Sequence, residues 1–234
     1  MAIKFSIIIP TKNEEKYLPD LLKDIKRQKN IKNYEIIVSD NNSSDKTRTI
    51  AKNFNCKIVD GGLPSKARNN GGKIAKGKYL IFFDADVRLI SETYIYDIIE
   101  LMKQKDIDCI IPTIKANTKN LFDKFVFEII SSFVFLTKPI YTLSFGANIF
   151  CSKKAFEKVR GFDENLIFAE DIDFTNKISK LYRTKTLFFK RYYFNLRRAK
   201  AQGRTKCYFS NLKKIYNTIV LKKKENYEFD IYDK

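Results

Sequence analysis

Short apolar runs alternate with helical periodicity through the first part of this chain. The runs have the length and composition of buried strands, and they are Phe5–Pro10, Tyr34–Asp40, Cys56–Asp60 and Tyr79–Phe83. Residues 17–25 repeat apolar side chains at helical spacing, Ser43 or Ser44 is placed to cap a helix that ends near Phe54, and residues 65–77 look helical. This alternation predicts the α/β class, with a mostly parallel sheet covered by helices.

Polar residues follow three of the four runs at the point where each run ends. They are Thr11, Asn13 and Glu14 after the first run, Asp40 at the end of the second, and Asp84 and Asp86 after the fourth. Ligands of open α/β sheets bind outside the carboxyl ends of the strands. We therefore expect these side chains to line one crevice.

Length and composition bound the classes of protein that are compatible with the chain. Its 234 residues suit one substantial domain over residues 1–190, followed by a basic, partly helical extension over residues 191–234. The absence of histidine excludes Ser-His and Cys-His catalysis and leaves carboxylates to handle protons and metal ions. Because the four cysteines form no C-x-x-C pair, we expect no zinc site, no disulfide framework and a cytoplasmic setting.

The net charge of +18 is unevenly distributed. From Lys177 to Lys224 the chain has 16 Lys and Arg residues and no Asp or Glu. A block of this kind favours an anionic partner or open solvent.

The first run is not followed by a known nucleotide-binding loop. It ends in "PTKNEE", which contains neither G-x-G-x-x-G nor the P-loop pattern. Five segments instead resemble the inverting glycosyltransferases of family 2, which have the GT-A fold. In chain order they are "IIIPTKNEEKYLPDLL", "EIIVSDNNSSDKT", "KARNNGGKIAKGKYLIFFDAD", "GANIFCSKKAFEKVRGFDE" and "AEDIDF", within roughly residues 5–187. D-x-D alone is a common motif, but the family's order and spacing make the set specific.

The resemblance implies a nucleotide-diphospho-sugar donor. Matched position by position, the donor-binding residues are Pro10, Thr11, Asn13, Glu14, Asp40, Arg68, Asp84 and Arg198. Lys12 stands where the family often has an aromatic residue that stacks on the base. The histidine that many relatives have downstream as a metal ligand is absent, and "NLRRAKAQGR" stands there instead. Arg197 or Arg198 is then expected to bind the diphosphate directly.

The resemblance also assigns the metal and the base. Asp86 of D-A-D is expected to bind Mg²⁺ or Mn²⁺, while Asp84 contacts the ribose or reaches the ion through water. The alternative is that this pair only caps the following helix. In "AEDIDF", Asp171 is expected to be the catalytic base and Glu170 to orient the acceptor hydroxyl, with Asp173 as the substitute base. The loop and strand of residues 144–150, with Gly146, would lie beneath the sugar.

Two later segments bear on the acceptor, which we expect to be a glycan or a lipid-linked molecule. The Phe-rich stretch Leu121–Leu136 is interpreted as a helix over the active site or, alternatively, as a lipid-facing helix. The stretch "CYFSNLKKIYNTIVLKKK" predicts a basic helix with an apolar stripe at Tyr208, Leu212, Ile215 and Ile219. Such a helix either docks on its own domain or lies peripherally on the anionic cytoplasmic face of a membrane.

Three other classes compete with this reading. A nucleic-acid-binding protein would explain the charge but would place basic residues on the main groove, where this chain has Asp and Glu. A nucleotidyltransferase would have a Gly-rich loop after the first strand, and "PTKNEE" has no glycine. An inactive binding module would not need both the D-A-D and the E-D pairs. We therefore expect a metal-dependent enzyme that transfers a sugar from a UDP- or GDP-sugar to a hydroxyl or phosphate.

Overall fold

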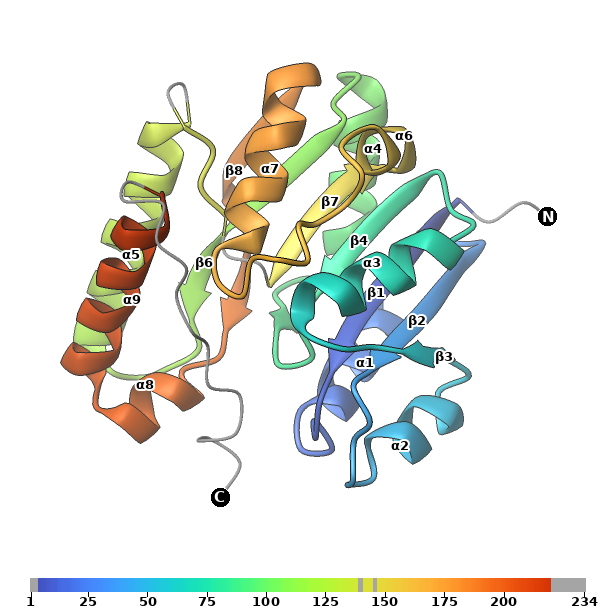
Figure 1. Cartoon of the computed structure of the whole chain (residues 1–234), viewed down its shortest axis with the longest axis horizontal. Coiled ribbons are helices and arrows are strands. Elements are labelled where there is room, and N and C mark those ends of the chain that lie inside the picture. Colours follow the sequence, from blue (N-terminus) through green and yellow to red (C-terminus); the bar gives the residue numbers. More distant parts are fainter. Residues whose placement is uncertain (1–3, 139–140, 145–146, 220–234) are drawn as a thin grey trace.

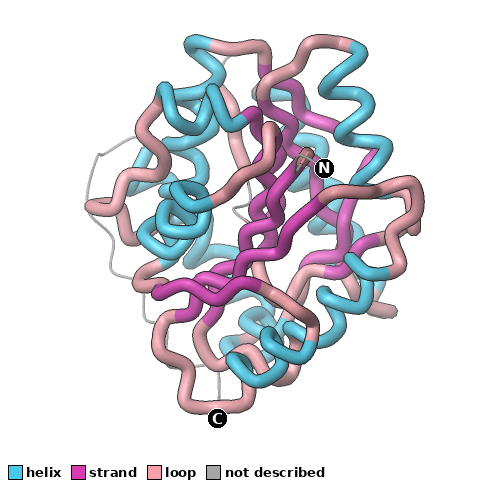
Figure 2. Tube along the Cα trace, turned by 90° about the vertical axis from the view of Figure 1, so that its right-hand side faces the viewer, coloured by secondary structure: helices cyan, strands magenta, loops and turns pink. Residues whose placement is uncertain are grey.

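The computed structural model describes residues 4–138, 141–144 and 147–219. Within them, one mixed sheet has the strand order β3-β2-β1-β4-β7-β6-β8-β5, and helices cover both of its faces (Figures 1 and 2). This architecture confirms the predicted α/β class.

The first half of the sheet is parallel and matches the four predicted strands. β1 (Phe5–Thr11) pairs with β2 (Tyr34–Asp40) and β4 (Tyr79–Phe83), and β2 pairs with β3 (Lys57–Asp60). The connecting helices are α1 (Leu18–Lys26), α2 (Thr47–Asn53) and α3 (Pro64–Ile74). All four strands therefore end at the same edge, as the sequence predicts.

The second half of the sheet contains reversals that the sequence pattern did not predict. β7 (Asn148–Ser152) runs antiparallel between β4 and β6 (Cys109–Ala116), β8 (Thr184–Phe194) runs parallel to β6, and β5 (Arg88–Leu89) runs antiparallel to β8. The remaining helices are α4 (Tyr94–Gln104), α5 (Leu121–Thr137), α6 (Lys153–Lys158), α7 (Glu170–Leu181), α8 (Arg197–Gln202) and α9 (Arg204–Ile219). The division into domains after residue 190 stays a prediction, and β8 continues across that position.

Alternating side chains of the central strands fill two cores, one on each face of the sheet. Ile7 and Ile9 belong to the core on one face, and Ile8 belongs to the core on the other. Leu80 and Phe82 of β4 lie in the same core as Ile8. Burial on both faces explains why these strands read as continuous apolar runs.

A glycine brings α3 against the sheet. A Cβ atom at Gly71 would lie 2.4 Å from Ile8 Cγ2 and 2.8 Å from Ser39 Oγ, so only glycine allows this approach. The same helix carries Arg68, which is buried. Close packing of α3 therefore fixes the position of this arginine.

The predicted cap of the second helix is wrong. α2 begins at Thr47, and its first backbone N–H donates to Asp45 Oδ1 over 2.9 Å. Ser43 instead donates its hydroxyl to Asp40 Oδ1 over 2.6 Å. The loop after β2 is thus organised around Asp40, and the helix starts later than the serines suggest.

Candidate active site

The two acids of D-A-D begin the site at the end of β4. The Asp84 backbone N–H donates to the Ala147 carbonyl over 3.0 Å, so the turn after β4 is tied to the start of β7. Arg68 Nη2 lies 2.8 Å from Asp84 Oδ1, and Arg197 Nε lies 3.2 Å from Asp86 Oδ2. Each acid therefore faces its own guanidinium group.

Arg68 joins the two ends of the site. Its Nη1 lies 2.7 Å from Glu170 Oε1 while its Nη2 contacts Asp84, so one side chain links D-A-D with the E-D pair. Burial lowers the pKa of Arg68, and the nearby charges of Asp84, Glu170 and Asp171 raise it by more. The net direction is upward, so the guanidinium stays charged in its buried position.

The E-D pair begins α7. Ala169, just before the helix, has the left-handed backbone angle φ 60°, which is unusual for a residue with a side chain. This turn directs Glu170 toward Arg68 and buries Asp171, whose Oδ2 accepts a 2.9 Å hydrogen bond from Ser144 Oγ. The positive end of the helix dipole stabilises carboxylates in this turn.

The environment of Glu170 shifts its acidity. Burial raises the pKa of Glu170 to about 7, with Arg68 acting in the opposite direction and Asp171 adding to the rise. By contrast, Asp173 forms an ion pair of 2.6 Å with Lys177, one turn further along α7. The two candidate bases thus differ in surroundings: Asp171 lies among the site residues, and Asp173 is paired along its own helix.

Arg197 at the start of α8 reaches the site from the C-terminal part of the chain. It lies 2.6 and 3.0 Å from the two carboxylate oxygens of Glu14, and its guanidinium lies 4.7 Å from the ring centre of Tyr17. With its contact to Asp86, Arg197 therefore pairs with two acids of the site, as Arg68 pairs with Asp84 and Glu170. The side chain of Arg198, which was the predicted donor ligand, lies outside the described residues, as does Gly146.

The predicted base-binding residues form a network of their own. Thr11 Oγ1 donates to Asp40 Oδ1 over 3.0 Å, and Asp40 Oδ2 lies 3.1 Å from Arg48 Nη1. Asn13 has φ 53°, and its backbone N–H donates to Ser43 Oγ over 2.9 Å. Pro10 pairs in register with Ser39 of β2. The structure therefore brings these residues together beside Glu14, which follows in the same loop.

Two tyrosines beneath the site, Tyr94 and Tyr192, were missed by sequence reasoning, whereas Asn148 lies in the segment 144–150 that the sequence places beneath the sugar. Asn148 Nδ2 donates to the Tyr94 hydroxyl over 2.7 Å, and Asn148 Oδ1 is buried with no hydrogen-bond partner among the residues that the structure describes. Burial raises the pKa of Tyr192, and Tyr94 and the site acids Asp84 and Asp171 add to the rise. Nothing in the local sequence signals these roles, because Tyr94 and Tyr192 come from segments that the motifs do not include.

The carboxylates of D-A-D suit a metal ion whose coordination a bound substrate would complete. Among the described residues, no group of three or more potential His, Cys, Asp or Glu ligands is preassembled. Mg²⁺ is usually held by one or two carboxylates together with water and substrate phosphates. Asp86 and Asp84 fit that pattern, although Arg197 contacts Asp86 and would have to share its oxygens or withdraw.

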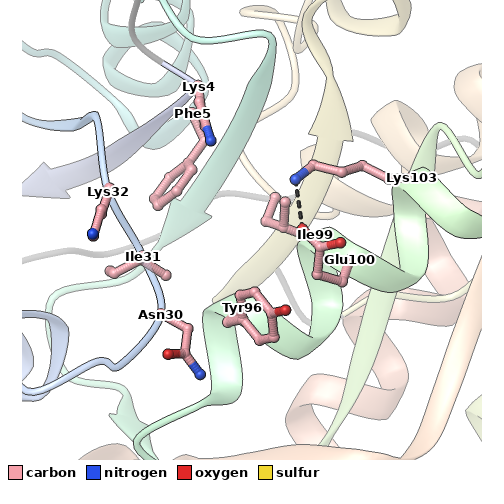
Figure 3. A pocket seen from close by; sticks show the side chains of 9 residues that line it. All are labelled: Lys4, Phe5, Asn30, Ile31, Lys32, Tyr96, Ile99, Glu100 and Lys103. Carbon is pink, nitrogen blue, oxygen red and sulfur yellow. Dashed lines mark hydrogen bonds and ion pairs between the residues drawn. The ribbon is translucent and has the colours of Figure 1, made fainter. Parts of the chain in front are cut away.

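A small pocket lies away from this site. It has a volume of about 140 Å³ and is lined by residues such as Phe5, Asn30 and Tyr96, near the starts of β1 and β2 (Figure 3). The acids described above follow the opposite, carboxyl ends of the strands. The pocket therefore plays no part in the candidate active site.

Comparison with known proteins agrees with the geometry. Residues 6–166 match the sequence profile of Glycosyl transferase family 2. The chain belongs to this family. A family 2 relative, the poly(ribitol-phosphate) beta-N-acetylglucosaminyltransferase TarS of Staphylococcus aureus, is 30% identical over 208 residues, which cover 84% of this chain and 36% of TarS. The chain thus spans about a third of the length of that relative.

Solved structures share the fold of this chain. The S. aureus TarS structure in complex with UDP-GlcNAc has a TM-score of 0.68 and 28% identity, covering 82% of this chain and 58% of that one. A mannosyltransferase from Pyrobaculum calidifontis, in complex with GDP-Man and Mn²⁺, has a TM-score of 0.68 at 16% identity, and covers 91% of this chain and 65% of that one. At this identity the second likeness supports the fold alone.

Proposed function

We propose that this family 2 protein catalyses a metal-dependent, inverting transfer of a sugar from a UDP- or GDP-sugar to an acceptor hydroxyl or phosphate. The observation that carries the proposal is the position of Arg68, which contacts both Asp84 of D-A-D and Glu170 beside Asp171. The residues expected to handle the donor and the residue expected to take the acceptor proton are therefore neighbours.

The donor would bind at the loops that follow β1, β2 and β4. Thr11, Asn13 and Asp40 are the proposed contacts to base and ribose, with Pro10 and Glu14 in the same loop. Asp86, with Asp84, would hold Mg²⁺ or Mn²⁺. When bound, the ion supplies positive charge for the diphosphate leaving group. Arg68 and Arg197 add two guanidinium groups that suit phosphate oxygens.

Asp171 is the proposed catalytic base. Its carboxylate is held by Ser144 and lies at the helix N-terminus, which stabilises the ionised form that can accept a proton. Glu170 would orient the acceptor. Inversion requires this base on the face of the sugar opposite the leaving nucleotide.

The acceptor class follows from the relatives only as a proposal. TarS is named for a poly(ribitol-phosphate) acceptor, and a Campylobacter jejuni relative, 36% identical over 38% of this chain and 31% of its own length, is named for an undecaprenol-linked one. We therefore propose a polymeric glycan or lipid-linked acceptor, reached from the cytoplasm with peripheral contact to an anionic membrane. The acids that lie at the site disfavour nucleic acid as a partner.

The deciding experiment is a thermal-shift series with UDP, GDP and their sugar conjugates, each with and without Mn²⁺. A ligand that binds only the folded chain raises its melting temperature. We expect a metal-dependent rise for one nucleotide, loss of that rise in Asp86→Ala, and its retention in the control Glu157→Ala, whose acid is exposed on α6. No rise with any nucleotide, combined with salt-sensitive binding of RNA, would overturn the proposal.

A further inference from the structure

The helix α5 carries an exposed apolar stripe, bordered by the exposed charged residues Lys124 and Glu128. Leu121, Phe125, Ile129, Phe133 and Leu136 follow one another at spacings of three or four residues, which places them on one side of the helix. Each of these side chains is between 53% and 77% exposed. Solvent-facing helix surfaces normally carry polar residues, so an apolar stripe of about 25 Å indicates a binding surface.

The acids of α5 do not interrupt this stripe. Asp123 is buried and is held by Arg204 Nε over 3.0 Å and by the Tyr208 hydroxyl over 3.0 Å, both from α9. Glu128 is paired with Arg191 of β8. Both acids of α5 are therefore paired with basic residues from the C-terminal part of the chain.

An irregularity in β8 adds another apolar side chain beside α5. Pro112 of β6 pairs with Leu187 of β8, yet Ile114 pairs with Tyr192, so residues 188–191 form a bulge. The Phe188 ring in this bulge lies 5.7 Å from the Phe135 ring of α5. Its neighbour Phe189 is 92% exposed. The bulge thus presents an exposed phenylalanine beside Phe188, whose ring packs on α5.

α9 lies beside α5 and contributes both apolar and basic residues. Tyr208 contacts Asp123 and packs on Phe127 of α5, and the two helices run side by side at one end of the molecule (Figure 1). On α9, Phe209 and Leu212 are exposed, as are Lys206 and Lys213. Exposed lysines therefore lie close in sequence to exposed apolar side chains.

We propose that this surface, which we call the α5 face, binds an anionic lipid bilayer in the interfacial plane. It comprises the exposed apolar residues of α5 and β8 with the neighbouring basic helix, namely Leu121, Phe122, Phe125, Ile129, Phe133, Leu136, Phe189, Lys206, Phe209, Leu212 and Lys213. Helices that combine Phe and Leu with Lys lie at the boundary of headgroups and acyl chains.

Charge complementarity selects a bilayer over a protein partner as the occupant. β8 and α9, which contribute Phe189, Lys206, Phe209, Leu212 and Lys213 to the α5 face, belong to the segment between Lys177 and Lys224. That segment carries 16 basic residues and no acid, which suits anionic headgroups. Within the described residues, no helix is long and apolar enough to cross a bilayer. An interfacial position therefore fits both the length and the charge of these elements.

The face is also connected to the active site. α9 follows α8 after Gly203, and α8 begins with Arg197, which contacts Glu14 and Asp86. A chain bound through α5 and α9 would hold this site near the membrane surface, where a lipid-linked acceptor is found. The inference rests on the membrane contact of the proposed function and names the surface that makes it, and lipid binding can be measured without any sugar donor.

Vesicle flotation tests the inference with the full chain. We expect the protein to float with phosphatidylcholine vesicles containing 30% phosphatidylglycerol, and much less with phosphatidylcholine alone or at high salt. The variants Phe125→Ser and Phe189→Ser should each lower the bound fraction about tenfold, because a buried phenylalanine contributes at least that factor. The control Ile74→Ser, at an exposed position of α3, should leave binding unchanged.

A second pair of variants separates charge from burial. Lys206→Gln with Lys213→Gln should weaken binding to the anionic vesicles, whereas the control Lys52→Gln with Lys73→Gln should not. The nucleotide-induced melting shift should persist in every variant, so failure here is distinguishable from failure of the proposed function. Absence of flotation would overturn the inference. So would equal loss in the controls, or a dimer in sedimentation that Phe125→Ser converts to monomer.

Discussion

Asp171 and Asp173 lie on the same turn of α7 but have different surroundings. Substituting each in turn therefore tests which of them is the catalytic base. Asp171→Asn should lower the turnover rate by about 10²–10⁴, because the general base is lost while the shape is kept. The matched control Asp173→Asn breaks only the ion pair with Lys177. Its turnover rate should stay within about twofold of the wild-type rate. Initial rates of sugar transfer give the comparison.

The assignment would be wrong if the two variants exchanged these effects. Nucleotide binding provides an independent check, since Asp171→Asn should keep the melting shift that the nucleotide causes. A variant that lost both rate and shift would indicate damage to the donor site instead.

Glu170 gives the folded chain a characteristic pH dependence. Its pKa is raised from the ordinary 4.5 to about 7, chiefly by burial, so between these values the folded state binds more protons than the unfolded state. Stability contributed by the protonated acid is therefore lost as pH rises through this window. Compared with Glu170→Gln, the wild type should lose melting temperature between pH 5 and pH 8. Parallel melting curves across that range would contradict the shift.

At the scale of elements, α3 depends on the absence of a side chain at Gly71. Gly71→Ala introduces a Cβ atom 2.4 Å from Ile8 Cγ2, and we expect a loss of about 1–3 kcal/mol in the free energy of unfolding. Lys73→Ala, an exposed position on the same helix, should change it by less than about 0.5 kcal/mol. Urea denaturation measures both. Equal stability of the two variants would show that α3 can shift away from β1 without cost.

The strands that could be predicted are those whose side chains are buried on both faces. Residues 5–10, 34–40 and 79–83 read as strands because local composition reports such burial, and the acids at their ends fall where topology places ligands. The direction of β7 was not readable, because a short apolar run has the same composition in either direction. The start of α2 was misplaced because Asp45, and not a serine, contacts its first N–H group.

Within the site, local motifs identified residues but not their partners. D-A-D and E-D were visible as pairs of acids, whereas Arg68, which bridges them, is 102 residues from Glu170 in the sequence. Arg197 and Arg198 are adjacent and equivalent in sequence. Helix geometry distinguishes neighbours of this kind, and the structure brings Arg197 to Glu14 across 183 positions.

For the whole molecule, the charge of +18 should accelerate encounters with anionic ligands. We expect the association rate of a fluorescent nucleoside diphosphate to fall at least tenfold between about 50 and 500 mM salt, because screening removes long-range attraction. An uncharged nucleoside analogue serves as the control and should show little change. Stopped-flow mixing measures both rates. A nucleotide rate independent of salt would mean that the site acids cancel the surrounding field.

Because Arg197 of α8 contacts Asp86, its guanidinium group and a cation bound at D-A-D would compete for the same carboxylate. Two partners that compete for a shared oxygen are linked reciprocally: each lowers the apparent affinity of the other by the same factor. Occupation of the site by a divalent ion would then loosen the attachment of α8 to the first strand's loop, and a firmly seated α8 would weaken the ion. The rate at which a protease cleaves the C-terminal segment would then depend on whether a divalent ion occupies the donor site.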